Sequence, residues 1–240
     1  MVNEATEAKI EFDRERAEQY DLNIRKAIPG YESLHGMAHS LLKTSLGETA
    51  NLLIVGSGTG RELIEYAQQN PHWNLTGVDP SGSMMAIAKT ELESKGFAEK
   101  VKLYTGYLKT LPTTEPMDAA TLILVMHFLP DDGAKLELLK SIAQRLQVGA
   151  KLILADLHGD RSAPYFNQFI AAWRSYYFSQ LDEESKAKAA VKFQASIDNS
   201  IHFVTEARII QLLETAGFSN AHKFYNAFLF GGWIAQYTGI

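Results

Sequence analysis

The stretch Asn51-Leu52-Leu53-Ile54-Val55-Gly56-Ser57-Gly58-Thr59-Gly60 decides the fold of this 240-residue chain. Its first half is an apolar run of strand length, and its second half places glycine at every other position. Glycine permits a sharp turn and a close approach of the backbone to a ligand. An amphipathic stretch over 61–69 follows at once. The sequence therefore predicts a strand, a glycine turn and a helix whose first N–H groups face a ligand.

The same alternation continues along the chain. We expect further strands at 74–79, 101–105, 119–125 and 150–156, with Ser81 capping the helix after the second strand and another helix over 131–147. After a helix over 205–215, the β-like runs 221–227 and 228–237 are too close for a helical crossover and must pair antiparallel. The expected fold class is α/β: a Rossmann-like, doubly wound sheet of seven strands, mostly parallel with an antiparallel C-terminal hairpin strand.

Length and composition indicate one globular domain over 1–240. Hydrophobic residues make up 46% and charged residues 21%, which is ordinary globular usage. Residues 1–50 are expected to form a helical N-terminal segment, and residues 161–203, which are rich in aromatic side chains, a helical insertion. No apolar run approaches the ~18 residues of a membrane helix and no signal peptide is recognisable, so we expect a cytoplasmic protein with no membrane partner.

Composition also excludes several kinds of site. The chain has no cysteine, so a thiolate metal site or nucleophile is ruled out. None of the seven histidines stands in an HExxH motif, and we expect no metal. The net charge of −5 is not that of a nucleic-acid-binding protein.

A carboxylate at the end of the second strand indicates the kind of ligand. Asp79 follows Gly60 by 19 residues, and an acid at this place can accept hydrogen bonds from both hydroxyls of an adenosine ribose. A dinucleotide fingerprint needs glycine at position 61, where this chain has Arg61. The glycine spacing and the terminal hairpin favour S-adenosylmethionine, and an NAD-dependent oxidoreductase is the alternative.

Five stretches carry a resemblance to a known family: residues 53–60, 77–84, 126–129, 146–154 and 213–218. With them the chain resembles the class I S-adenosylmethionine-dependent methyltransferases from about residue 10 to its end. Residues 12–14 and 28–31 are similar to the subgroup that contains the carboxy-S-adenosylmethionine synthases.

The resemblance implies S-adenosyl-L-methionine as cofactor and assigns residues to it. The methionine part would contact Gly56, Ser57, Gly58 and Gly60. Asp79 would hold the ribose, and the adenine would lie among Pro80, Met84 and the backbone of Tyr107 and Leu108. Leu124 would contact the cofactor near its sulfonium, and Tyr31 would reach it from the N-terminal segment. The acceptor would be a small molecule, and the insertion 161–203 lies where the family places its substrate lid. A homodimer is an open alternative to a monomer.

Three positions depart from the family pattern. Ile54 replaces an acid, and Tyr107 replaces an aspartate that lies near the adenine amino group in many members. These two changes keep a non-catalytic adenosine-ligand binding protein among the alternatives. In carboxy-S-adenosylmethionine synthases an arginine of the helical insertion pairs with the extra carboxylate, and ungapped alignment places Gln194 there. We therefore expect ordinary methyl transfer rather than carboxy-cofactor synthesis.

His127, just after the fourth strand, is the candidate catalytic residue. An imidazole there can serve as general base or contact the acceptor, or it can simply be a helix-entry residue. Asp156 and His158 end the fifth strand and are weaker candidates, because a helix N-terminus and turn explains each of them better than contact with the acceptor. Neither the acceptor nor the atom that receives the methyl group follows from the sequence.

Overall fold

A seven-stranded sheet organises the chain, as expected. The computed structural model describes residues 14–112 and 115–239. The strands are β1 (Ala50–Val55), β2 (Trp73–Asp79), β3 (Val101–Thr105), β4 (Met117–Ile123), β5 (Leu146–Leu157), β6 (Phe218–Ala227) and β7 (Phe230–Tyr237). They lie in the order β3-β2-β1-β4-β5-β7-β6, in which β1 to β5 pair parallel and β7 pairs antiparallel with both neighbours. The predicted fold class is confirmed.

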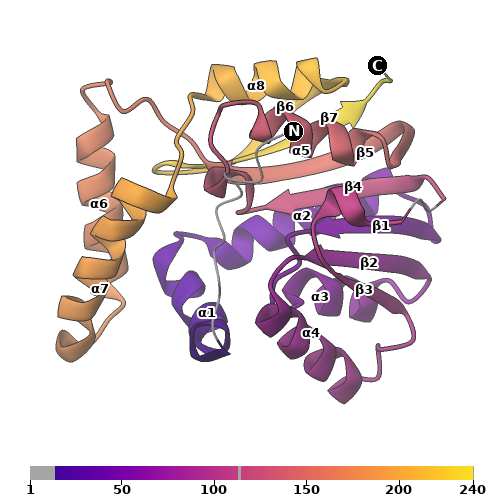
Figure 1. Ribbon diagram of the computed structural model, residues 1–240, viewed down its shortest axis with the longest axis horizontal. Coiled ribbons are helices and arrows are strands. Elements are labelled where there is room, and N and C mark those ends of the chain that lie inside the picture. The colour runs from indigo at the N-terminus through magenta and orange to yellow at the C-terminus, as the bar shows by residue number, and fades with distance from the viewer. Residues whose placement is uncertain (1–13, 113–114, 240) are drawn as a thin grey trace, which may run out of the picture.

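Helices cover both faces of the sheet (Figure 1). They are α1 (Arg14–Ala27), α2 (Tyr31–Ser45), α3 (Arg61–Gln69), α4 (Gly82–Ser94), α5 (Ala134–Ala143), α6 (Phe166–Ser179), α7 (Glu183–Ala195) and α8 (Glu206–Thr215). In β1, Leu52 and Ile54 join the core under α2 and α3, whereas Leu53 and Val55 join the core under α5 and α8. Because successive strand residues point to opposite faces, an all-apolar strand requires cover on both sides.

Several element boundaries differ from the predicted ones by a few residues, and two of these differences have a clear structural cause. The helix expected over 131–147 is α5, which ends at Ala143, and Leu146 instead begins β5 by pairing with Met117. The strand expected to reach residue 125 ends at Ile123, because Leu124 has a left-handed backbone with φ of 61°. Apolar periodicity placed these elements but not their ends, which strand pairing and backbone geometry decide.

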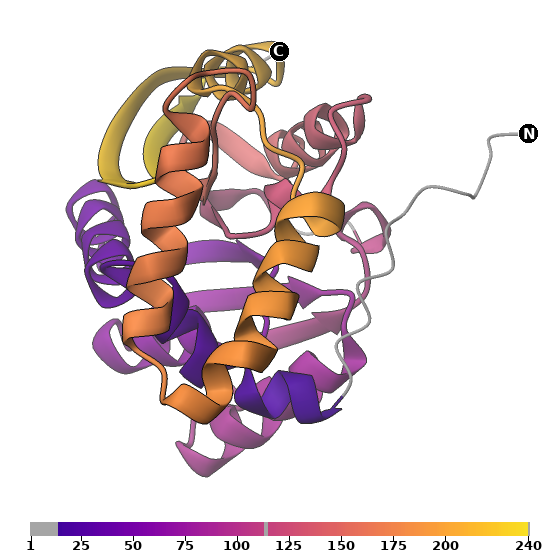
Figure 2. The same ribbon diagram turned by 90° about the vertical axis from the view of Figure 1, so that its left-hand side faces the viewer.

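Three helices stand across the carboxyl ends of the parallel strands. In Figure 2, α6 and α7 pass in front of the sheet with α1 beside them. The indole N–H of Trp173, on α6, donates to the carbonyl of Ala27 at the end of α1 with an N···O distance of 2.7 Å. The Trp173 ring also packs edge-on against Phe193 and Phe230. The aromatic stripe of the insertion thus packs on the sheet domain through its buried members.

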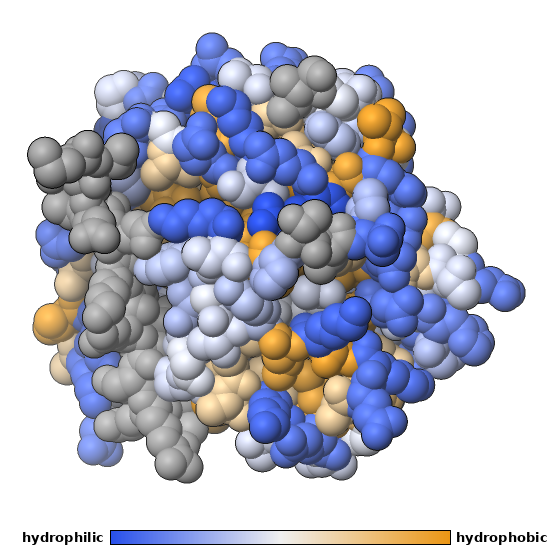
Figure 3. Space-filling model, turned by 45° about the vertical axis from the view of Figure 1, so that its right-hand side comes forward, coloured by the Kyte–Doolittle hydropathy of each residue, from blue (hydrophilic) through white to orange (hydrophobic). Residues whose placement is uncertain are grey.

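None of the described helices is long and apolar enough to cross a bilayer. The face seen in Figure 3 is mostly hydrophilic, with apolar residues in small separate patches.

Candidate functional site

The glycine turn between β1 and α3 has left-handed backbone at three positions. The φ angles are 73° at Gly56, 53° at Gly58 and 89° at Gly60. A Cβ added at Gly56 would lie 2.2 Å from a methyl carbon of Val125, and one at Gly60 would lie 3.0 Å from the Cβ of Ala88. A Cβ at Gly58 would meet nothing within 4 Å. Gly56 and Gly60 therefore allow close packing against Val125 and Ala88, whereas Gly58 faces open space.

Asp79 ties this turn to the end of β2. Its carboxylate accepts the backbone N–H of Gly58 at 2.9 Å and that of Ser81 at 2.8 Å. Burial raises the pKa of Asp79 above its usual value, and the two backbone hydrogen bonds oppose that rise. The Ser81 hydroxyl caps α4 by accepting the N–H of Met84, as predicted. Ser57 is buried, and its N–H donates to the carbonyl of Val78.

The turn after β3 lies beside Asp79. The Gly106 N–H donates to the Asp79 carbonyl at 2.9 Å, which brings Tyr107 and Leu108 to the same strand ends. The Tyr107 ring is 39% exposed and carries the Lys109 ammonium 5.6 Å from its centroid. Pro80 is exposed, whereas Met84 and Leu108 are buried.

Helix α1 reaches the glycine turn from the other side of the site. The Thr59 hydroxyl donates to the Asp21 carboxylate at 2.7 Å. Tyr31, the first residue of α2, lies under the Arg61 guanidinium, 4.8 Å from ring centroid to carbon, and against the edge of His35. Burial, the largest effect, raises the pKa of Tyr31 well above its usual value. Its ring is not among the residues that line the cavity described next.

A cavity of about 550 Å³ opens beside the carboxyl ends of β4 and β5. Its walls come from the strand ends, α1, α6, α7 and the turn after α7: Tyr20, Asn23, Ile24, Ala27, Ile28, Leu124, His127, Phe128, Leu157, Trp173, Tyr177, Ala189, Lys192, Phe193, Ser196, Ser200, Ile201 and Phe230. The left-handed backbone of Leu124 costs ~1–3 kcal/mol for a residue other than glycine. That kink ends β4 and places both Leu124 and His127 on the cavity wall.

His127 is held by a partner that sequence reasoning treated separately. Its Nδ1 lies 2.6 Å from Oδ1 of Asp156, and its backbone N–H donates to Oδ2 at 3.1 Å. The Asp156 carboxylate is buried, and the N–H of Leu157 also donates to it. The buried Lys135 donates to the Met126 carbonyl at 2.7 Å. Adjacency of parallel β4 and β5 was the signal for this pair, since polar residues that end neighbouring strands meet at one edge.

His158 lies elsewhere. Its ring stacks edge-on against Trp233 at 5.3 Å, and burial lowers its pKa to about 4. It is not among the cavity-lining residues, whereas Asp156 reaches the cavity through His127.

Two histidines on α2 have a spacing that the sequence reading overlooked. His35 and His39 lie four residues apart, on one face of the helix, which is a spacing that can hold a metal. His39 Nε2 is instead 2.8 Å from the Asn70 amide nitrogen, and the His35 ring is buried beside Tyr31. In the described part of the chain no three histidine, aspartate or glutamate side chains are grouped to hold a metal ion.

Known proteins resemble this chain in sequence and in fold. Residues 53–152, which contain the glycine turn, Asp79 and His127, match the model of a methyltransferase domain family. A carboxy-S-adenosyl-L-methionine synthase of Nautilia profundicola is 31% identical over 102 residues, which cover 42% of this chain and 43% of that one. The first alignments thus span less than half of the relatives' length. The synthase of Methylococcus capsulatus is 24% identical over 93% of this chain and 92% of its own length.

Solved structures share the fold. A putative O-methyltransferase of Nostoc punctiforme superposes with a TM-score of 0.64 and 18% identity, covering 93% of this chain and 59% of that one. An S-adenosylmethionine-dependent methyltransferase of Methanosarcina mazei gives a TM-score of 0.60 at 18% identity, covering 82% of this chain and 97% of that one.

Proposed function

We propose that this chain, which carries a methyltransferase domain of the class I S-adenosylmethionine-dependent fold, transfers a methyl group from S-adenosylmethionine to a small-molecule acceptor. The cavity volume of about 550 Å³ and the net charge of −5 support a small molecule rather than a nucleic acid as acceptor. The chain has no cysteine and so no disulfide framework of the secreted kind, which supports a cytoplasmic place of action.

One observation carries the proposal: the glycine turn and its acid share an edge of the sheet with the cavity. Gly58 faces open space next to the Asp79 carboxylate, and an adenosyl ligand needs this combination of a close backbone approach and a hydroxyl acceptor. The residues present therefore fit S-adenosylmethionine. We assign its methionine part to 56–60, its ribose to Asp79, its adenine to Pro80, Met84, Tyr107 and Leu108, and its sulfonium side to Leu124.

Bound S-adenosylmethionine supplies an electrophilic methyl carbon, so the chain has to align a nucleophile and exclude water. The walls at Phe128, Trp173 and Phe230 supply an apolar enclosure. His127 points its Nδ1 at Asp156, which fixes Nδ1–H as the donor and leaves Nε2 to take a proton from an O–H or N–H acceptor. We propose His127 as the general base and Asp156 as its positioning residue.

Titration calorimetry with S-adenosylhomocysteine tests the cofactor site. We expect binding by the native chain and at least a tenfold loss, about 1.4 kcal/mol, in Asp79→Ala. Circular dichroism establishes that the variant is folded. Unchanged affinity in the folded variant would refute the assignment, and tight NADH binding without S-adenosylhomocysteine binding would favour the oxidoreductase alternative.

A carboxy-S-adenosylmethionine synthase is the second candidate, because relatives of that name match nearly the whole chain. Gln194, at the position of the expected arginine, is exposed and donates to the Asp198 carboxylate at 3.0 and 3.1 Å. No arginine occurs between Arg174 and Arg208. Mass spectrometry of the ligand that copurifies with the protein decides, since a carboxylated cofactor would establish the second candidate.

A further inference from the structure

We propose that the acceptor is an elongated organic anion. Its apolar or aromatic end lies in the His127 cavity, and its carboxylate or phosphate lies among Lys26, Lys188 and Lys192 in a second chamber. This inference rests on the proposed methyl transfer and specifies its substrate class.

The second chamber adjoins the first. It has a volume of about 830 Å³ and lies between α1 and α7, and its lining includes Lys26, Lys188 and Lys192. Six of its lining residues also line the His127 cavity: Asn23, Tyr177, Ala189, Lys192, Ser196 and Ser200. The two spaces therefore share a boundary that a single ligand can cross.

Charge is distributed unevenly across this boundary. The inner cavity has mainly apolar walls and contains, among its described lining residues, the charged side chain of Lys192 at the boundary. The outer chamber adds Lys26 and Lys188 together with hydroxyl and amide groups, and its described lining includes no aspartate or glutamate. Three lysines without a lining carboxylate are unusual in a chain whose net charge is −5.

Three acids at the start of α7 and in the turn after it have partners within the chain. The Asp182 carboxylate caps α7 by accepting the Ser185 N–H at 2.8 Å. This hydrogen bond is the main cause that lowers the pKa of Asp182, and the positive charge of Lys26 makes a smaller contribution in the same direction. Glu183 pairs with Lys186, and Asp198 accepts from Gln194. None of these acids is among the described lining residues of the chamber, whose charged side chains are the three lysines.

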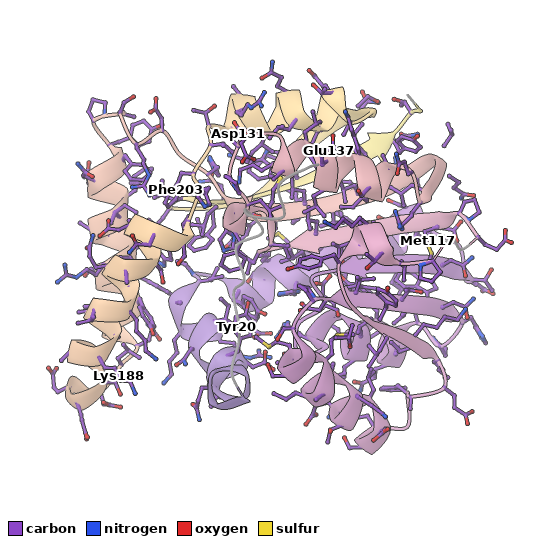
Figure 4. All side chains as sticks on the ribbon, viewed as in Figure 1. Tyr20, Met117, Asp131, Glu137, Lys188 and Phe203 are labelled. Atoms are coloured by element: carbon purple, nitrogen blue, oxygen red, sulfur yellow. The ribbon has the colours of Figure 1, made fainter. Side chains whose placement is uncertain are left out.

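Helical geometry sets two of the three amines on one face of α7, and Lys26 lines the same chamber from α1. Lys188 and Lys192 are four residues apart on α7, so they project from the same face, one turn or about 5–6 Å apart. Figure 4 shows Lys188 on α7 and Tyr20 on α1 on the side of the sheet away from Met117, which starts β4. All three lysines are exposed, so each ion pair with a ligand is weak and salt-dependent. The preference for an anionic ligand comes from the combined effect of the three lysine ion pairs.

Calorimetry on the full chain saturated with S-adenosylhomocysteine tests this proposal with four phenylbutyl probes. They are 4-phenylbutyrate, 4-phenylbutyl phosphate, the neutral 4-phenylbutyramide and the cationic 4-phenylbutylamine. We expect both anions to bind at least fivefold more tightly than the amide, and the amine to bind most weakly. The ratio of phosphate to carboxylate affinity identifies which anion the chamber prefers.

Lysine variants test which side chains cause the preference for anionic probes. Lys188→Met combined with Lys192→Met should reduce affinity for the anions about fivefold, to the level of the amide, and leave the amide and S-adenosylhomocysteine unchanged. Arginine at both positions should retain anion binding. Lys186→Met is the matched control, because this lysine lies on the same helix, pairs with Glu183 and does not line the chamber.

Equal binding of acid, amide and amine would overturn the proposal, as would an unchanged preference in the double variant or no binding of any probe at millimolar concentration. Failure of the methyltransferase assignment is distinguishable: S-adenosylhomocysteine would then fail to bind while the anion preference, measured on the chain alone, persisted.

Discussion

Gly56 and Gly58 share a left-handed backbone but have different surroundings, and this difference yields a paired prediction. Gly56→Ala forces a Cβ against Val125 and should lower the free energy of unfolding by about 3 kcal/mol. Gly58→Ala pays only the backbone cost of about 1–2 kcal/mol, but its methyl group enters the proposed ligand space. Denaturant unfolding should single out Gly56→Ala, and calorimetry with S-adenosylhomocysteine should show at least a tenfold loss of affinity in Gly58→Ala. Equal affinity in Gly58→Ala and the native chain would contradict the site.

Glu62, at the start of α3, makes the stability of the protein depend on pH. Burial raises its pKa to about 7, and the hydrogen bond that the Tyr66 hydroxyl donates to it opposes the rise. The folded chain therefore binds a proton that the unfolded chain releases near pH 4.5, so this residue contributes less stability as pH rises from 4.5 to 7. The loss is roughly 3 kcal/mol.

Glu62→Gln tests that dependence. The variant should match the native chain at pH 5 and be more stable by about 2–3 kcal/mol at pH 8, because it keeps a neutral group at the buried position. Urea unfolding at both pH values measures the difference. Glu99→Gln, at an exposed position, is the control. A constant difference between Glu62→Gln and the native chain at the two pH values would show that Glu62 does not carry the effect.

At the scale of elements, the sequence predicted the features that depend on residues close together in the chain. The glycine turn, the Ser81 cap and the hairpin follow from residues close together in the chain, and each has the expected geometry. Leu146 fits an amphipathic helix equally well, and only its pairing with Met117 makes it a strand residue. His127 and Asp156, 29 residues apart, had been weighed singly, because a sequence shows strand ends but not the hydrogen bond between them.

Helix α1 supplies a second contact that no local pattern predicts. Asp21 accepts the Thr59 hydroxyl and so fastens α1 to the glycine turn. Asp21→Ala should raise amide exchange in residues 19–27 and weaken S-adenosylhomocysteine binding about fivefold, as expected for one partly buried hydrogen bond. Asp21→Asn should restore both, since its amide oxygen still accepts. If the asparagine variant behaves like the alanine variant, charge rather than the hydrogen bond fastens the helix.

At the scale of the whole molecule, the cavity is built by segments far apart in the sequence. Its roof combines α1 with α6 and α7, and its floor is the carboxyl edge of the sheet. Composition indicated an aromatic insertion over 161–203, yet which of its rings face the cavity depends on the position of α1. Trp173 joins the two parts, because its ring packs on Phe193 and Phe230 while its N–H donates to Ala27.

Trp173→Phe separates the hydrogen bond of this roof from its packing. A phenyl ring preserves apolar contact with the two phenylalanines but cannot donate to Ala27, so the free energy of unfolding should fall by about 1 kcal/mol and amide exchange in residues 19–27 should rise. Trp73→Phe is the matched control: it deletes an indole hydrogen bond to the Gly47 carbonyl at the opposite end of the sheet. Hydrogen exchange followed by mass spectrometry compares the two variants without any ligand. Both α1 and α6 line the cavity. Faster amide exchange of α1 in Trp173→Phe alone would therefore show that the Trp173–Ala27 hydrogen bond holds α1 against α6. Equal exchange in both variants would assign that role to packing.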